Sequence, residues 1–359
     1  MGIVVVKFGG TSVATEEARK EAISHIKSLI AAGKNIIVVV SAMGRKGSPY
    51  ATDTLISLLR TGSNLSTLDL LMSCGEVISA CVFADNLMQQ GIDAVALTSA
   101  QAGIVTNGVF GSADIFDIDT TLLKKELYEG KVVVVPGFQG VSVRNEITTL
   151  GRGGSDTSAV VIGRFMNAES VHIFTDVPGI AIVDPKIVPK AKFMEYVDMH
   201  HMYELTRWGA GIIHPRAVKE AKKCNLDLYV RSTFDKGLGT KIVKDMKTTG
   251  PVGIGIIKGC NLFEADETDN LIIGKEEKRA VRKTPDDKYS LITVVFGGYS
   301  EDYIREAIDT LPIKTMPFFN QESAHIFVET NRVELLANEL YRKLFEKVIT
   351  LKSNQPEEI

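Results

Sequence analysis

Two short glycine-rich segments carry residues whose types and spacing suit the binding of phosphate and carboxylate groups. In the first segment, Lys7 follows the apolar run 4–6 and stands just before Gly9 and Gly10. Glycines let backbone N–H groups approach an anion closely, and a lysine adds a full positive charge. The segment is not the Walker pattern, because there the lysine follows the glycines. Taken alone, it is described equally well as a strand with an exposed lysine and a tight turn.

The second segment, 151–156, places Arg152 among three glycines and ends in Ser155 and Asp156, where an apolar helical stretch begins. An arginine can hold a carboxylate with two parallel hydrogen bonds, and an aspartate can bind an ammonium group. A surface loop with a capping aspartate is the alternative. We favour a ligand-binding site, because a glycine-dense loop that contains both charges has little structural purpose.

The order of strands and helices in the first 135 residues predicts an α/β fold, a mostly parallel sheet with helices on both faces. Ligands bind beyond the carboxyl ends of such strands. Thr11 and Ser12 are candidate caps for the first helix. Helices are expected at 16–30, 68–90, 122–129, 157–165, 198–210 and 217–223, and strands at 4–6, 36–40, 93–97, 131–135, 171–175 and 228–231.

After about residue 249 the pattern changes to a smaller α+β unit, so we expect domains at 1–249 and 250–359. The charged run 276–288 is expected to be a solvated loop, and the tail 352–359 to be frayed. The strands expected in this unit are 252–257, 270–273, 291–296 and 325–329, and the helices are 303–310 and 332–345.

Composition excludes several classes of partner. The chain has 359 residues, 45% of them hydrophobic, and a formal net charge of −3, which gives no support for binding to nucleic acid or to a membrane surface. We find no cleavable signal pattern and no apolar run that reaches the length of a membrane span. The four cysteines lack metal-ligand spacing, which favours free thiols in a reducing cytoplasm.

Read together, the segments resemble the aspartate kinases of the amino-acid kinase superfamily. The resemblance covers nearly all of 1–240, in the family's order, at 7–12, 39–44, 51–55, 75–76, 137–140, 148–159, 174–180, 184–185, 209–210 and 214–216. It implies phosphoryl transfer from MgATP to the side-chain carboxylate of L-aspartate, a step in the biosynthesis of lysine and threonine. A carboxylate is already ionised at neutral pH, so catalysis would rest on alignment and charge neutralisation.

The resemblance also implies residue roles. Lys7 and Asp156 would be catalytic, and Mg²⁺ would be held through ATP without a direct protein ligand. The ATP site would comprise Lys7, Gly9, Gly10, Ser41, Thr175, Asp176, Asp184 and Lys186. The aspartate site would comprise Ser41, Thr52, Glu76, Phe138, Arg152, Gly154, Ser155 and Asp156.

Three residues on the nucleotide side depart from the family pattern: Lys186 replaces an arginine, Gly211 a lysine and Ala181 a tyrosine. Loss of one phosphate-facing cation should cost about 1.5–3 kcal/mol of charge-assisted bonding. The C-terminal part resembles paired ACT domains but is shorter, and it lacks the Pro-Gly turn that cups an effector. We therefore expect a homodimer formed through this domain, with weak or absent feedback by lysine.

Two alternatives remain. One is a related enzyme of the superfamily that transfers phosphoryl or nucleotidyl groups to another amino acid or analogue in a specialised pathway. The other is a non-catalytic amino-acid-binding subunit, although the presence of Lys7, Arg152 and Asp156 argues against it.

Overall fold

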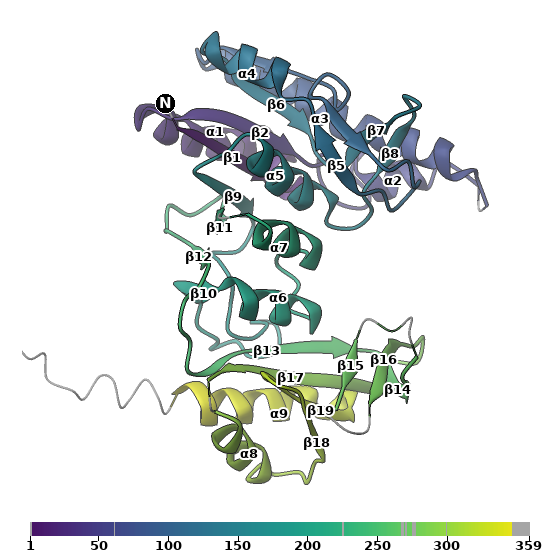
Figure 1. Cartoon of the computed structure of the whole chain (residues 1–359), viewed down its shortest axis with the longest axis vertical. Helices are drawn as coiled ribbons and strands as arrows, with labels where there is room; N and C mark the ends of the chain where they lie inside the picture. Colours follow the sequence, from purple (N-terminus) through teal and green to yellow (C-terminus); the bar gives the residue numbers. More distant parts are fainter. Residues whose placement is uncertain are drawn as a thin grey trace, which may run out of the picture. The chain divides into compact units, whose positions relative to one another are not determined.

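The computed structural model describes residues 2–60, 62–224, 226–266, 269, 271–274, 278–298 and 300–346. The chain divides into two compact units (Figure 1). The first contains Met1–Gly179 and Ile213–Ile242, and the second contains Ile180–Ile212 and Val243–Ile359.

The first unit is built on a mostly parallel sheet, as the sequence predicts. Within this unit its strand order is β12-β11-β9-β1-β2-β6-β3, and among the pairs whose register is known only β11 and β12 run antiparallel. The strands are β1 (Ile3–Phe8), β2 (Asn35–Val40), β3 (Ala94–Ala96), β6 (Val132–Pro136), β9 (Ser170–Thr175), β11 (Asp227–Ser232) and β12 (Thr240–Val243).

The central strands end level with one another. Phe8 of β1 lies opposite Val40 of β2 and Phe174 of β9, and Val40 in turn lies opposite Pro136 of β6. The turns that follow these strands therefore meet at one edge of the sheet, the edge at which parallel α/β sheets bind ligands.

Helices cover this sheet because its strands are apolar on both faces. On one face, Val4, Val6 and Val38 pack against buried side chains of α1 (Glu16–Ala31) and α3 (Leu65–Gln89). Successive strand residues point to opposite faces, so Val5 and Val39, also fully buried, belong to the other face. The remaining helices of this unit are α2 (Thr52–Ile56), α4 (Thr121–Tyr128), α5 (Gly154–Phe165) and α7 (Pro215–Lys222).

The expected cap of the first helix is wrong. Helix α1 is capped by Thr15, whose side chain accepts a hydrogen bond from the N–H of Ala18. Thr11 and Ser12 instead belong to the short 3-10 helix η1 (Gly10–Val13). The buried Ser12 hydroxyl accepts a hydrogen bond from Thr233 (2.6 Å), a partner from the far end of the unit that the local sequence does not reveal.

A second sheet in this unit was not predicted, because its strands are only three or four residues long. Its order is β5-β4-β7-β8, formed by Ile115–Ile118, Ile104–Thr106, Gln139–Ser142 and Ile147–Thr149. It matters for function because β7 begins directly after Phe138, and β8 ends directly before the loop that carries Arg152.

Helix α3 corrects the expectation that no apolar run in the chain reaches the length of a membrane span. With 25 residues and a mean hydropathy of 1.5 in its most apolar window, it is long and apolar enough to cross a membrane by length and composition alone. Half of that window is buried within the fold, and the buried face includes Asp69 and Glu76. Core helices of soluble proteins pass the same test, so the length of α3 is weak evidence for a membrane span.

The second unit contains an antiparallel sheet in the order β13-β17-β19-β18. The strands are β13 (Gly250–Lys258), β17 (Tyr289–Gly297), β18 (Pro317–Phe319) and β19 (Ser323–Glu329). Helices α8 (Glu301–Asp309) and α9 (Val333–Tyr341) pack on one face through Ile304 and Leu336. Helix α6 (Met199–Arg207) and Trp208 pack with Leu291 and Val295, which point to the other face.

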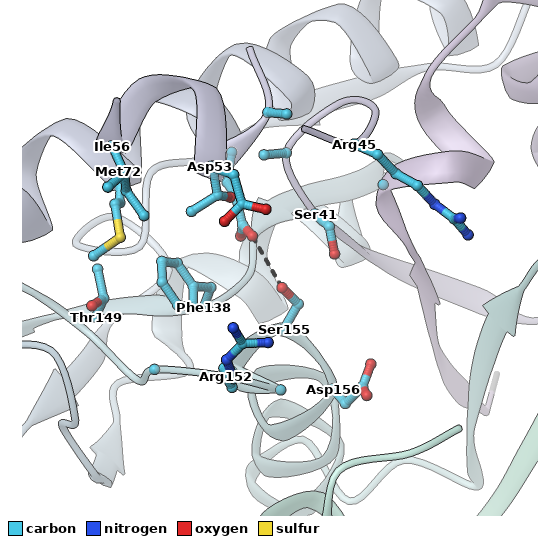
Figure 2. Close-up of a pocket in the computed structure, with 18 of the residues that line it drawn as sticks. Ser41, Arg45, Asp53, Ile56, Met72, Phe138, Thr149, Arg152, Ser155 and Asp156 are labelled. Atoms are coloured by element: carbon cyan, nitrogen blue, oxygen red, sulfur yellow. Dashed lines mark hydrogen bonds between the residues drawn. The ribbon is translucent and has the colours of Figure 1, made fainter. Parts of the chain in front are cut away.

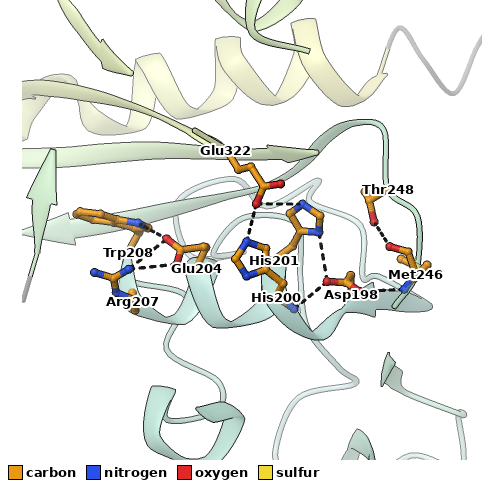
Figure 3. A network of polar contacts seen from close by, with 9 residues as sticks. All are labelled: Asp198, His200, His201, Glu204, Arg207, Trp208, Met246, Thr248 and Glu322. Carbon is orange, nitrogen blue, oxygen red and sulfur yellow. Dashed lines mark hydrogen bonds and ion pairs between the residues drawn. The ribbon is translucent and has the colours of Figure 1, made fainter. Parts of the chain in front are cut away.

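Polar residues of α6 also contact Glu322, the residue directly before β19 (Figure 3). His200 pairs with Glu322 at 2.6 Å, and the buried His201 lies 3.6 Å from Asp198. The indole N–H of Trp208 donates to Glu204.

A three-stranded sheet completes this unit, in the order β14 (Cys260–Glu264), β16 (Arg279–Lys283) and β15 (Ile272–Ile273). The prediction of a solvated loop over 276–288 is therefore wrong for β16. Its Ala280 and Val281 are buried, while Arg282 pairs outward with Asp266 and Asp269. The tail 352–359 lies outside the described residues.

Residues 180–212 group with the C-terminal sheet, because Val183, Ile187 and Val188 share a core with α8 and α9. The boundaries between the compact units therefore differ from the expected domain boundary at residue 249. The division into a catalytic part, 1–249, and a regulatory part, 250–359, stays a prediction.

Candidate active site

A cleft of about 850 Å³ opens in the first unit where the central strands end (Figure 2). Many of the residues that the sequence predicts for the site line it together: Lys7, Gly10, Ser41, Thr52, Glu76, Phe138, Arg152, Gly154, Ser155 and Asp156. The two glycine-rich segments are therefore parts of one site, although they are far apart in the sequence.

An ion pair joins these two segments. The Nζ atom of Lys7, near the end of β1, lies 2.7 Å from Oδ1 of Asp156 in the first turn of α5, and both side chains are nearly buried. The first N–H groups of a helix have no partner within the helix and carry partial positive charge. The amino end of α5 thus adds to the charge of Lys7, and the two together form a positive edge of the cleft.

The two glycines after β1 differ in their surroundings. A Cβ at Gly10 would lie 2.6 Å from the carbonyl oxygen of Gly44 and 2.8 Å from that of Ala42, so only glycine lets the turn after β2 close over it. Gly9 is not among the residues that line the cleft, and its N–H donates to the carbonyl of Phe174 at 3.2 Å. The helix that begins at the cleft is α5.

Glu76 and Ser155 form a second polar pair in the cleft. The Ser155 hydroxyl donates to Oε1 of Glu76 at 3.0 Å, and the Glu76 side chain is buried. Burial raises the pKa of the Glu76 carboxyl from 4.5 to about 8, against the opposing effects of the Ser155 hydrogen bond and the positive charge of Lys7. At neutral pH this carboxyl is therefore mostly protonated.

The loop 150–153 between β8 and α5 carries Arg152 into the cleft. Figure 2 shows its guanidinium group on the same side of the cleft as Ser155. Gly151 and Gly153 both have positive φ angles, which favour glycine. At Gly153 a side chain is also excluded by space, because a Cβ would lie 2.1 Å from Cβ of His214.

Asp69, which the sequence reasoning missed, holds the strand end next to this loop. This fully buried carboxylate of α3 accepts hydrogen bonds from the N–H (2.8 Å) and hydroxyl (2.7 Å) of Thr149 and from the N–H of Gly111 (2.8 Å). A signal was present, because Asp69 and Glu76 are seven residues apart, or about two helical turns, and therefore share a face of α3.

Phe138 lines the cleft in a left-handed backbone conformation (φ 65°), which is uncommon outside glycine. Its N–H donates to the Ser158 hydroxyl of α5 at 3.0 Å. The neighbouring Gly137 permits this close approach, since a Cβ there would lie 2.8 Å from Cβ of Ser155. The cleft wall is thus shaped by contacts between α5 and the two residues that follow β6.

Two further cations, Arg45 and Lys46, line the cleft and were not predicted. The available signal was a basic pair directly after the small polar turn that follows β2. Arg45 pairs with Asp176 at 2.5 Å, and Asp176 accepts a hydrogen bond from Thr175. Neither Thr175 nor Asp176 lines the cleft, and their predicted contact with the nucleotide stays a prediction.

The other predicted nucleotide residues, Asp184 and Lys186, belong to the second unit. There Oδ1 of Asp184 accepts a hydrogen bond from the backbone N–H of Lys186 at 2.9 Å, and both side chains are exposed. Their ATP role also stays a prediction. Among the described residues, no three His, Cys, Asp or Glu side chains are grouped so that they could hold a metal ion.

The chain belongs to the amino acid kinase family, whose model matches residues 2–232. It is 45% identical to aspartokinase 1 of Bacillus subtilis (strain 168) over 245 residues, which are 67% of this chain and 61% of that protein. It is 40% identical to the aspartokinase of Geobacillus stearothermophilus over 280 residues, 77% of this chain and 67% of the relative. The chain thus spans about three fifths to two thirds of these relatives.

Solved structures show the same fold. The structure of E. coli aspartokinase III in complex with aspartate and ADP matches with a TM-score of 0.78 at 20% identity, covering 96% of this chain and 100% of that one. An aspartate kinase structure from Clostridium acetobutylicum matches with a TM-score of 0.74, also at 20% identity, covering 95% and 100%. The expectation of an amino-acid kinase fold is confirmed.

The raised pKa of Glu76 predicts a pH-dependent stability. Between about pH 5 and about pH 8, the folded chain binds more protons at Glu76 than the unfolded chain, so this residue makes the free energy of unfolding fall as pH rises. The slope is at most about 1.4 kcal/mol per pH unit. Glu76→Gln is neutral throughout, so its stability relative to the native chain should increase with pH in urea denaturation.

Asp85→Asn is the control, because it removes a carboxylate from the exposed face of the same helix. Its stability should follow that of the native chain at each pH. If Glu76→Gln retained the full native slope, the proton would not reside on Glu76.

Proposed function

We propose that the protein is an aspartate kinase that transfers the γ-phosphoryl group of MgATP to the β-carboxylate of L-aspartate. The observation that carries this proposal is the shared cleft, in which the Lys7–Asp156 ion pair lies beside Arg152, Glu76 and Ser155. The aspartokinase relatives support it, and so does the likeness in fold to E. coli aspartokinase III in complex with aspartate and ADP.

The positive edge of the cleft suits the phosphate side of the reaction. A β-carboxylate oxygen attacks the γ-phosphorus, and the bond from that phosphorus to the β–γ bridging oxygen breaks, so ADP leaves without any proton transfer. Lys7 and the amino end of α5 neutralise charge on the transferred group, and Asp156 keeps the Lys7 ammonium in place. Arg45 and Lys46 supply further positive charge. Mg²⁺ would be held through the phosphates, since it binds oxygen ligands and retains waters.

The guanidinium group of Arg152 and the carboxyl group of Glu76 on α3 suit the two ends of an amino acid, a carboxylate and an ammonium group. Arg152 binds the α-carboxylate with its guanidinium fork. Glu76 binds the ammonium group, and Ser155 orients the Glu76 carboxylate through their hydrogen bond. Ser41 and Thr52 line the same cleft and would face the substrate side chain.

Loss of Lys7 should abolish most of the transfer. We expect Lys7→Ala to lower kcat by about 10² or more in a hydroxamate assay with aspartate and ATP, because a charge that meets the transferring phosphoryl group is removed. Lys20→Ala, which breaks an exposed ion pair with Glu16 on α1, should retain native activity. Native-like turnover by Lys7→Ala would refute the catalytic assignment, and phosphorus NMR showing AMP as product would refute the reaction.

Binding of aspartate should release a proton. An ammonium group beside Glu76 favours the ionised carboxylate, so a residue that is protonated in the cleft at neutral pH would lose its proton on binding. Calorimetry at about pH 7, in two buffers with different ionisation enthalpies, should detect release of up to about one proton per chain. Glu76→Gln should release none, whereas equal release by both chains would place the proton elsewhere.

We further propose that the C-terminal part forms a cytoplasmic homodimer and responds weakly or not at all to lysine. At the end of β17 the chain itself fills the space beside Gly297: a Cβ there would lie 2.5 Å from the carbonyl oxygen of Thr248 and 3.0 Å from Nε2 of His201. Ser300 donates to the carbonyl of Gly297 and accepts from the N–H of Gly250. Tyr299, in the same turn, lies outside the described residues.

Lysine added to the hydroxamate assay should therefore leave the rate nearly unchanged up to millimolar concentration, because Thr248 and His201 already occupy the space beside Gly297 at the end of β17. A parallel titration with threonine serves as a comparison. Strong inhibition by micromolar lysine would contradict this proposal and leave the kinase assignment intact.

A further inference from the structure

Arg216, at the start of α7, holds the loop that carries Arg152 although it does not line the cleft. One guanidinium nitrogen donates to the carbonyl of Leu150 at 2.5 Å. Another donates to the carbonyl of Ala113 at 2.8 Å and pairs with Asp114 at 2.5 Å. The planar fork of an arginine suits two neighbouring acceptors, which a lysine cannot reach together.

The conformation of this loop depends on the hydrogen bond to the carbonyl of Leu150. Leu150 is fully buried, and its N–H already donates to the carbonyl of Phe138 at 2.8 Å. The next residue, Gly151, turns the chain with a positive φ angle, and Arg152 follows. Without Arg216, a buried carbonyl loses its partner, and rotation of this peptide toward water would move Arg152 with it.

The other end of the loop rests on the same helix start. The side chain of His214 caps α7, with Nδ1 accepting from the N–H of Arg216 at 3.3 Å. Burial lowers the pKa of His214, which favours the neutral ring that this acceptor role requires. The His214 side chain also packs against Gly153, where no Cβ could fit. The tripeptide from His214 to Arg216 thus contacts the loop at both ends.

We propose that Arg216 is a positioning residue for Arg152. It keeps the loop 150–153 in the conformation that presents the Arg152 guanidinium to the carboxylate of the amino-acid substrate. This inference rests on the proposed function for its substrate, whereas the holding of the loop itself does not depend on it.

The test compares Arg216→Ala and Arg216→Lys with Arg164→Ala. Arg164 is the matched control, because it pairs with Glu220 at the other end of α7 (3.0 Å) and is about as exposed as Arg216. We expect Arg216→Ala to raise KM for aspartate by about tenfold or more, the equivalent of about 1.4 kcal/mol. The KM for ATP and kcat should change by less than about twofold.

Arg216→Lys should give an intermediate KM for aspartate, because an ammonium group restores only part of the fork. If Arg216→Ala does not fold, the KM of Arg216→Lys for aspartate still tests the inference. An unchanged KM for aspartate, an equal rise of both KM values, or the same rise in Arg164→Ala would each overturn the inference.

A readout without catalysis separates this inference from the kinase assignment. Trypsin cleaves after arginine, so limited proteolysis followed by mass spectrometry reports the release of the loop at Arg152. Cleavage there should be about tenfold faster in Arg216→Ala than in the native chain or Arg164→Ala. If cleavage were faster in Arg216→Ala but the native chain had no aspartate kinase activity, the holding of the loop would be supported and the proposed function refuted. Unchanged cleavage would refute the holding of the loop.

Discussion

The ion pair between Lys7 and Asp156 is the contact on which the geometry of the cleft depends. It joins the end of β1 to the first turn of α5, with 2.7 Å between the charged atoms and little exposure of either side chain. Removing one partner of such a pair leaves an uncompensated charge in a poorly hydrated place, which is costly. The pair therefore fixes the start of α5 against the sheet, and with it Ser155 and the loop that precedes the helix.

The carboxyl group of Asp156 in this pair and that of the nearby Glu76 have different surroundings. Asp156 has the Lys7 ammonium at ion-pair distance and lies in the first turn of its own helix. Glu76 is buried, and burial outweighs the hydrogen bond from Ser155 and the charge of Lys7, so its pKa rises to about 8. One cleft thus contains an aspartate that is paired with a cation and a glutamate that is mostly neutral until a cation approaches.

Supporting contacts around the cleft come from residues that never face it. Asp69 holds Thr149 and Gly111 from the α3 side, while Arg216 holds Leu150 and Ala113 from the α7 side. Both act on the backbone next to the glycines, and a glycine-rich loop needs such contacts because glycine itself restricts the chain so little. The freedom that lets Gly151 and Gly153 adopt left-handed conformations is thus limited by side chains from two different helices.

The amino-acid sequence by itself determined the class of the fold, most of its longer elements and the segments that meet at the cleft. Runs such as 36–40 predict buried strands wherever they occur, and the spacing of glycines around Arg152 is local information. Short strands such as β8 and β16 were missed, because three to five residues carry too weak a periodic pattern to be separated from a loop.

Only the tertiary structure decided which of these residues share a partner. Several contacts join residues that are far apart in the chain. They are the hydrogen bond from Gly9 to Phe174, the ion pair of Arg45 with Asp176, and the hydrogen bonds of Asp69 and Arg216. The raised pKa of Glu76 likewise follows from burial, which is a property of the packed unit. Residue type states what a side chain can do, but its distance to partners and its access to water arise only when the chain has folded.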